Sequence, residues 1–339
     1  MDRGIKSLSF GDTYRFLDVS VGIRSDSHDV QKFLRSSYPR FLVNKTAVDK
    51  EICVEVNKRS QPYKACIHAL DYRYLVFKTT RGFVLNCENF VSGDVERVIF
   101  NDGLVHHLSP AEIPFVIDDE VSEDDQNHIF AFVQIVLLRT VATLMPHRHL
   151  LHAAAAAWND NGVILPAAAG HGKTMLSLAL VKQGFNFLSD DVACLDLAFN
   201  NVEPFPRSVN LRRTGRGILE ALLQPGSIGD SRNHGPMDID ELFPASLGRT
   251  CPLRFVFLLK GEFRLEPELR SISKRRALWQ ALKLSHTPVS NPGDALWRLS
   301  SIFDRARCYE LRVGELSTTA RLIRREVELP RGRGELYAN

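Results

Sequence analysis

Short runs in which apolar and polar residues alternate dominate the N-terminal third of the chain. Such runs cover residues 14–23 (YRFLDVSVGI), 64–70 (KACIHAL), 72–80 (YRYLVFKTT) and 82–86 (GFVLN), and polar turns separate them. Alternation of this kind is typical of half-buried strands. One stretch around Val30–Ser37 has helical spacing instead. The pattern predicts a small α+β domain in residues 1–118.

A long apolar segment, Ile129–Leu144, follows a run of acidic residues at 118–125. The apolar segment contains Gln134 and Arg139, so it predicts a buried helix rather than a membrane span. Ser122 is placed to cap the start of this helix, and acidic side chains in a first turn favour the positive end of the helix dipole. Capping and solvation therefore explain the acidic run better than a metal-binding loop does.

After Pro146 the pattern changes to long apolar runs separated by turns. Residues 150–158 (LLHAAAAAW) predict a strand, NDNG a tight turn, and 163–167 (VILPA) the returning strand. Residues 173–183 are apolar at helical spacing, and a helix ending at Gly184 is typical of C-terminal glycines. Residues 185–197 (FNFLSDDVACLDL) predict one further strand. Residues 119–329 are therefore expected to form an α/β domain, and 330–339 a C-terminal tail.

The segment 162–174, GVILPAAAGHGKT, connects that returning strand to the helix. It departs from the phosphate-binding loop pattern at one position, because Ala167 stands where the first glycine is expected. The surrounding strand, loop, helix and second strand are the context that such a loop requires. An alanine at this position costs little if its φ is negative. The alternative is an ordinary strand-to-helix turn.

In a loop of this kind, backbone N–H groups and the helix N-terminus face a polyphosphate. Lys173 is expected to neutralise the β- and γ-phosphate oxygens, and the Thr174 hydroxyl to bind Mg²⁺. Asp190 and Asp191 follow the next predicted strand closely, at the edge of the sheet where ligands bind. The nucleotide-binding residues predicted by this pattern are Ala168, Ala169, Gly170, His171, Gly172, Lys173 and Thr174.

These motifs resemble the C-terminal catalytic domain of the bacterial HPr serine kinase/phosphorylase family, and more closely its HPr-kinase-related relatives found beside peptide-modification genes. The resemblance is carried by His152 in LLHAA, by GVILPAAAGHGKTMLSLALVKQGFNFLSDDV and by EPFPRSVNLR, and it covers residues 152–213. It implies a P-loop, HPr-kinase and PEP-carboxykinase-like α/β domain that uses ATP and Mg²⁺. The stretch NLRRTGRG departs from that of bifunctional members, which weighs against a reverse phosphorylase activity.

The resemblance also implies a role for each site residue. Thr174 and Asp191 are the expected metal ligands, Asp190 the base that accepts the hydroxyl proton, and His152 a further residue of the kinase site. Arg207 is expected either to clamp the transferring phosphate or to cap a loop. For His152 the alternative is a structural histidine.

The HRHLLH run invites a metal site, but His147 and His149 would share one face of a strand and His152 the other. A site built from all three histidines is therefore not expected. The six cysteines form no C-x-x-C pair, which indicates neither zinc nor a disulfide framework and favours a reducing cytosol. A net charge of +3 is too small to indicate nucleic-acid binding.

These observations together predict a cytoplasmic, ATP-dependent and Mg²⁺-requiring serine kinase. Its acceptor is expected to be a hydroxyl of a small protein or peptide, with neither nucleic acid nor membrane as a partner, and homo-oligomerisation is left open. Two alternatives remain, a small-metabolite kinase and a non-catalytic ATP-binding accessory protein in peptide maturation. The intact Lys173, Thr174 and aspartate pair favour catalysis over the accessory role.

Overall fold

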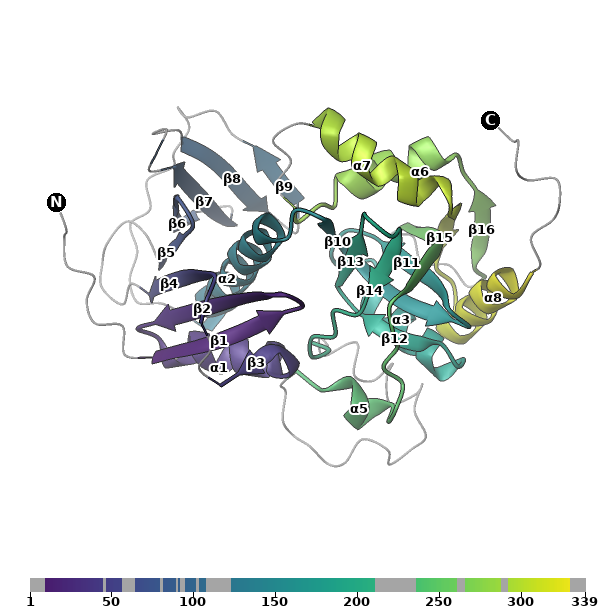
Figure 1. The fold of residues 1–339 in the computed structure, drawn as a ribbon, viewed down its shortest axis with the longest axis horizontal. Helices are drawn as coiled ribbons and strands as arrows, with labels where there is room; N and C mark the ends of the chain where they lie inside the picture. The colour runs from purple at the N-terminus through teal and green to yellow at the C-terminus, as the bar shows by residue number, and fades with distance from the viewer. Residues whose placement is uncertain are drawn as a thin grey trace. The chain divides into compact units, whose positions relative to one another are not determined.

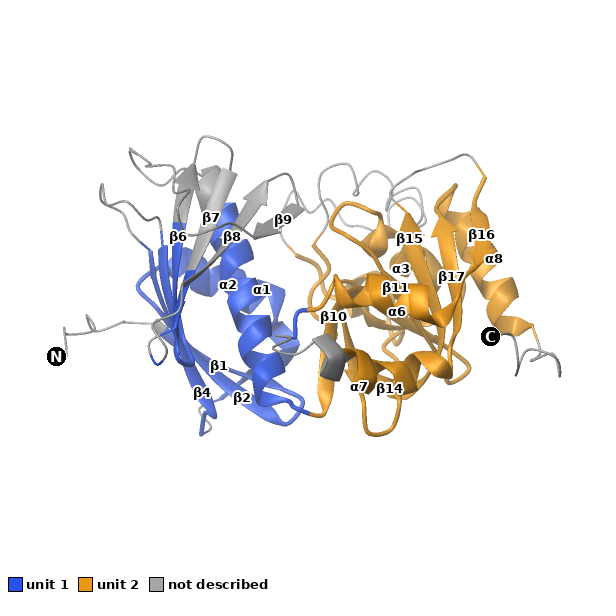
Figure 2. Cartoon of the chain, turned by 90° about the horizontal axis from the view of Figure 1, so that it is seen from above, with its two compact units in different colours: residues 1–146, 286–288 blue, residues 147–285, 289–339 orange. Residues whose placement is uncertain are grey.

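The computed structural model describes residues 10–44, 47–56, 65–79, 82–89, 91, 95–101, 104–107, 123–210, 236–260, 266–287 and 292–329. It is a mixed α/β protein with two sheets (Figure 1). The chain forms two compact units, coloured separately in Figure 2. Unit 1 comprises residues 1–146 and 286–288, and unit 2 comprises residues 147–285 and 289–339.

Unit 1 contains a nine-stranded sheet with the strand order β3-β1-β2-β4-β5-β6-β7-β8-β9. Adjacent strands are antiparallel except β2 and β4, which are parallel. The alternating runs predicted from the sequence are therefore strands. The strands are β1 (Phe10–Phe16), β2 (Val19–Ser25), β3 (Leu42–Val43), β4 (Lys50–Val56), β5 (Ala65–Ala69), β6 (Tyr72–Thr79), β7 (Gly82–Asn89), β8 (Val95–Asn101) and β9 (Leu104–His107).

Two helices pack on this sheet, α1 (His28–Ser37) and α2 (Glu123–Leu144). Ser27 caps α1, and the 3₁₀ turn η1 (Pro39–Phe41) follows that helix. The rings of Phe33 and Phe130 stack with centroids 4.7 Å apart, so the two helices contact each other. From the sequence, α2 was predicted to belong to the second domain, whereas its contacts with β2, β5 and β6 place it in unit 1. Ser122 lies outside the described residues.

Helix α2 contains the one stretch of the described chain that is long and apolar enough to span a membrane, Asn127–Leu144. Its mean hydropathy is 1.5, and half of it is buried inside the protein. The helix lies against the unit 1 sheet and contributes Val133, Val136 and Leu137 to the core. These contacts agree with the prediction of a core helix.

Unit 2 contains an eight-stranded sheet in which the long strand β10 changes partners along its length. The first part of β10 pairs with β13, and the second part pairs with β11 on one side and β12 on the other. Strands β11, β15 and β17 run parallel to one another. The strands are β10 (Arg148–Trp158), β11 (Asn161–Pro166), β12 (Asn186–Ser189), β13 (Val192–Asp196), β14 (Asn201–Glu203), β15 (Cys251–Lys260), β16 (Glu268–Ser271) and β17 (Arg307–Arg312).

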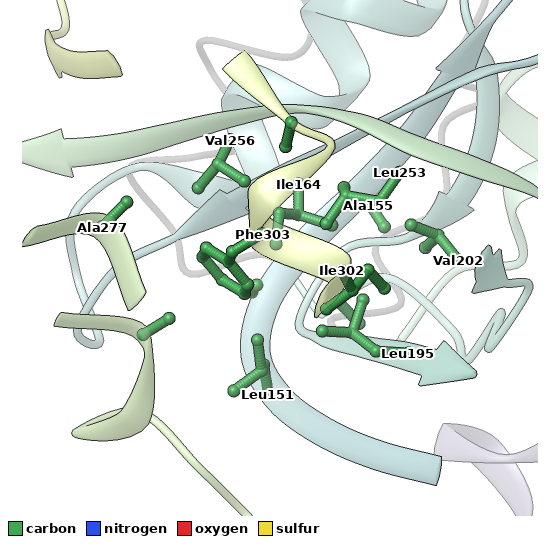
Figure 3. Packing of buried hydrophobic residues seen from close by; sticks show 14 of the residues in the cluster. Leu151, Ala155, Ile164, Leu195, Val202, Leu253, Val256, Ala277, Ile302 and Phe303 are labelled. Atoms are coloured by element: carbon green, nitrogen blue, oxygen red, sulfur yellow. The ribbon is translucent and has the colours of Figure 1, made fainter. Parts of the chain in front are cut away.

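Helices cover both faces of this sheet, and each face has its own hydrophobic core. Residues of α3 and α8 pack with one face, and residues of α6 and α7 with the other, where Phe303, Ile302 and Ala277 meet the strand residues shown in Figure 3. This arrangement is a three-layer α/β unit. The helices are α3 (Lys173–Lys182), α5 (Ile239–Leu242), α6 (Lys274–Leu282), α7 (Pro292–Asp304) and α8 (Leu316–Glu328).

The predicted hairpin and helix of unit 2 are confirmed, but β10 begins earlier than predicted, at Arg148, and β11 begins at Asn161, inside the predicted NDNG turn. Asn159 and Asp160 have positive φ in the turn between β10 and β11, and Gly184 has a φ of 93° just after α3. The prediction of one strand over 185–197 was wrong, because the backbone leaves the β conformation at Asp190 and Asp191 and gives β12 and β13. The Ser189 side chain stabilises this break, since its hydroxyl accepts hydrogen bonds from the backbone N–H groups of Asp191 and Val192.

Candidate functional site

The loop between β11 and α3, residues 167–172, is called here the glycine loop. Gly170 and Gly172 have φ values of 83° and 82°, which residues with a Cβ rarely adopt. Ala167 is not among the residues with positive φ, so the condition that the sequence analysis set for an alanine there is met. Ala167 is buried at the end of β11. The conformation of the loop therefore needs glycine at two positions and tolerates alanine at the first.

Lys173 begins α3, and its side chain turns back under the glycine loop. Its ammonium group donates hydrogen bonds of 2.9 Å to the backbone oxygens of Ala167 and Ala168, and it lies 2.9 Å from Nε2 of His152. Burial lowers the pKa of Lys173 to about 8, although the nearby carboxylates of Asp190 and Asp191 oppose this shift. The lysine is thus a buried cation whose present partners are neutral groups that an anion could replace.

The two aspartates at the β12–β13 break have different surroundings. Asp190 is fully buried, and its Oδ2 accepts a hydrogen bond of 3.3 Å from the hydroxyl of Thr174. Burial raises the pKa of Asp190, and the neighbouring Arg207 opposes the rise. The side chain of Asp191 is 17% exposed. Asp190 is therefore the carboxylate that reaches the first turn of α3, and Asp191 is the more accessible of the pair.

Arg207 connects the two aspartates. Its Nε lies 3.3 Å from Oδ1 of Asp190, and its Nη2 lies 3.2 Å from Oδ2 of Asp191. The segment that carries it is fixed to β12, because the backbone N–H of Phe205 donates to the carbonyl of Leu188. From the sequence, Arg207 was predicted to clamp a phosphate or to cap a loop. The structure places the guanidinium against the carboxylates, where it holds both in the site.

His152 lies between the lysine and the second aspartate. Since the Lys173 ammonium group donates to Nε2, the imidazole proton is assigned to Nδ1, which lies 3.3 Å from Oδ1 of Asp191. Burial lowers the pKa of His152, with Asp191 acting in the opposite direction and Lys173 adding to the decrease. The histidine is therefore neutral at physiological pH and belongs to the site.

His149 occupies the same strand but not the site. It is buried, its Nε2 forms a hydrogen bond of 2.9 Å with the Ser285 hydroxyl, and burial lowers its pKa to about 4. His147 is exposed. A three-histidine site is not present, and no group of three or more His, Cys, Asp or Glu residues in the described ranges could hold a metal ion.

The residues around Thr174 nevertheless fit a magnesium ion bound together with a nucleotide. Mg²⁺ is usually held by one or two carboxylates plus substrate phosphates, rather than by a cage of protein ligands. The hydroxyl of Thr174 and the carboxylate of Asp190 already lie within 3.3 Å of each other and offer hard oxygen atoms. Such a donor set suits a metal ion that arrives with its phosphate ligands.

The site therefore brings together every residue named from the sequence. Ala168 to Thr174 form the loop and the first turn of α3, and His152, Asp190, Asp191 and Arg207 converge beside Lys173. Sequence reasoning missed the segment at Leu284 and Ser285, whose backbone and hydroxyl hold the His152 strand. Nothing in the local pattern there indicated this contact.

No family model matches the chain, and no curated protein matches it. Among solved structures, the chain is similar to the HPr(Ser) kinase/phosphatase from Coxiella burnetii, with 17% sequence identity and a TM-score of 0.27, over 53% of this chain and 99% of that chain. A likeness with that TM-score does not establish a shared fold. Membership of the HPr kinase family, which the sequence motifs predicted, stays a prediction.

Proposed function

We propose that the chain is an ATP-dependent phosphotransferase of the HPr-kinase-like type, acting on a serine hydroxyl of a small protein or peptide in the cytoplasm. One observation carries this proposal. A buried lysine, a threonine hydroxyl at a helix N-terminus and two carboxylates held by an arginine converge beside a glycine loop. This combination provides what phosphoryl transfer requires, namely positioning and charge neutralisation.

The nucleotide phosphates would lie against the glycine loop and the N-terminus of α3. Lys173 would exchange its hydrogen bonds to the carbonyls of Ala167 and Ala168 for hydrogen bonds to phosphate oxygens. The new bonds would be stronger, because they join a buried cation to an anion. Thr174 and Asp190 would hold Mg²⁺, which neutralises phosphate charge when bound. The loop residues Ala168 to Gly172 would contribute backbone N–H groups.

The geometry favours roles for the aspartates that are the reverse of those expected from the sequence. Asp190 is buried against Thr174, which suits a metal ligand, whereas Asp191 is more accessible and lies beside His152. In the transfer step, the bond between the γ-phosphorus and the bridging oxygen breaks and ADP leaves. The acceptor oxygen forms the new bond to phosphorus, and its proton passes to the carboxylate of Asp191. Arg207 and His152 position that carboxylate.

Incubation of the purified protein with γ-labelled ATP and candidate acceptors tests this function. Label in a serine of a protein or peptide acceptor supports the proposal, and label in a small hydroxyl compound supports a metabolite kinase instead. The protein alone serves as the control for simple hydrolysis and self-labelling. Mg²⁺-dependent ATP binding without transfer to any acceptor would favour the accessory role.

A further inference from the structure

Two of the three tryptophans of the chain are exposed on the outer layer of unit 2. Trp279 on α6 is 56% exposed, and Trp297 on α7 is 80% exposed. The third, Trp158, packs against Phe185 and lies under the guanidinium of Arg324. Tryptophan is highly buried on average and is enriched at protein interfaces. Two exposed tryptophans on neighbouring helices therefore indicate a binding surface.

The core does not need these two side chains. The apolar faces of α6 and α7 are filled by other residues, among them Leu278 on α6 and Phe303 on α7, which pack against the sheet. The two helices also pack against each other. Next to Trp297, Leu296 is 39% exposed. The outward faces of both helices thus present apolar area that the described residues of unit 2 leave exposed to solvent.

Basic side chains accompany the tryptophan of α6. Arg275, Trp279 and Lys283 are spaced four residues apart and are all exposed, so they form one ridge along the helix. The ammonium group of Lys283 lies 5.8 Å from the centre of the Trp279 ring. Residues 274–283 contain four basic residues and no acidic one. The surface therefore combines aromatic area with positive charge.

The same ridge leads directly to the candidate site. Leu284 follows Lys283, and its carbonyl accepts a hydrogen bond of 2.7 Å from the backbone N–H of His152. Ser285 forms a β-bridge with Leu151, and its hydroxyl is hydrogen-bonded to His149. The chain that leaves α6 is therefore tied to the strand that carries His152. A partner bound along the ridge would therefore lie next to the segment that is bonded to the His152 strand.

We propose that Arg275, Trp279, Lys283, Leu296 and Trp297, here called the docking face, bind an acidic segment of the phosphoryl acceptor that also carries apolar side chains. This inference rests on the proposed kinase function, because it names the chemistry of the acceptor. Charge complementarity favours an acidic partner. A lipid surface is less suited, since an interfacial helix binds lipid through its apolar face and those of α6 and α7 are occupied by the core.

Fluorescence anisotropy of a short labelled peptide of alternating glutamate and leucine tests the docking face without ATP. We expect Trp297→Ala to weaken binding roughly tenfold or more, as for an aromatic anchor, and Arg275→Glu combined with Lys283→Glu to abolish it. Leu329→Ala is the control, because Leu329 is 48% exposed at the end of α8, which packs on the opposite face of the sheet from α6 and α7. The same peptide with glutamine in place of glutamate should bind weakly.

Equal binding by the Trp297→Ala and Leu329→Ala proteins would overturn the proposal, and so would equal binding of the glutamate and glutamine peptides. Tight binding of phosphatidylserine vesicles that depends on Trp297, without peptide binding, would also overturn it in favour of a lipid surface. Lys173→Ala should bind the peptide as the wild type does. A protein that binds the peptide but never transfers phosphate would contradict the proposed function and leave the docking face standing.

Discussion

Two clusters in unit 2 contain similar side chains at neighbouring positions of strand β10 but differ in what surrounds them. The structural cluster comprises two separate pairs formed by adjacent residues of β10, the ion pair of 2.5 Å between Arg148 and Glu203 and the hydrogen bond between His149 and Ser285. The site cluster comprises His152, Lys173, Asp190, Asp191 and Arg207. Both combine a histidine, an arginine and carboxylates in partly or fully buried positions.

The difference lies in the backbone next to each cluster. In the structural cluster, Arg148 is paired with Glu203 on β14, and His149 is paired with Ser285 in the Leu284–Ser285 segment. The site cluster lies against the glycine loop and the N-terminus of α3, where backbone N–H groups favour an anion. Its lysine is bonded to two carbonyls and an imidazole, none of which neutralises its charge. A buried ion pair alone therefore does not indicate an anion-binding site in this protein. A buried cation beside a helix N-terminus does.

The largest effect is expected at Asp191. Asp191→Asn should lower phosphoryl transfer by about 10²- to 10⁴-fold while retaining Mg·ATP binding, because an amide cannot accept the proton. Asp190→Asn should instead weaken the Mg²⁺ dependence of ATP binding, since a neutral oxygen is a poorer ligand. Transfer rates and calorimetric ATP titrations measure the two effects. The opposite result would restore the roles expected from the sequence, and full activity in both variants would remove the kinase function.

His149 of the structural cluster should make the free energy of unfolding depend on pH. The pKa of His149 falls from 6.5 to about 4 on folding because of burial. As the pH falls, the imidazole of His149 is therefore protonated in the unfolded protein before it is protonated in the folded protein. The free energy of unfolding decreases as the pH falls from about 6.5 to about 4, and the loss reaches about 3 kcal/mol at pH 4. His149→Gln should flatten that pH dependence in urea unfolding, with turnover at neutral pH little changed. His147→Gln is the control, and an unchanged pH profile in His149→Gln would contradict a buried neutral histidine.

A smaller effect is expected from the two arginines. Arg207→Lys should lower kcat roughly tenfold, the value of one charge-assisted hydrogen bond, since a lysine cannot hold both aspartates at once. The KM for ATP should change less. Arg148→Lys should lower the thermal stability and leave kcat unchanged. If the two substitutions changed kcat equally, the distinction between the clusters would fail.

The smallest effect is expected in the glycine loop. Ala167→Gly should keep turnover within a few-fold, because Ala167 does not use a positive φ. The added freedom of the unfolded chain should lower the free energy of unfolding by about 0.4–1 kcal/mol. Denaturant unfolding and steady-state kinetics measure both quantities. A large loss of activity would show that the buried methyl group of Ala167 is needed to hold the loop in its conformation.

Much of unit 2 could be predicted because its signals are local. The hairpin of β10 and β11, the glycine loop and α3 each follow from residues that are adjacent in sequence, and the short spacing between Lys173 and Asp190 indicated the site. Contacts between distant segments could not be predicted. Ser285 and His149 lie 136 residues apart, and no pattern near either residue indicates their hydrogen bond. The sheet against which α2 packs could not be predicted either, because the sequence of an apolar helix does not specify which surface the helix covers.

Isothermal calorimetry of Mg·ATP with the wild-type and Lys173→Ala proteins tests the central claim most directly. The account predicts binding to the wild type and a loss of about 10- to 100-fold in the variant, because a buried cation would no longer offset the phosphate charge. Lys182→Ala, an exposed lysine on the same helix, should bind as the wild type does. Equal affinity of the Lys173→Ala and wild-type proteins, with both folded, would contradict a phosphate site at the glycine loop.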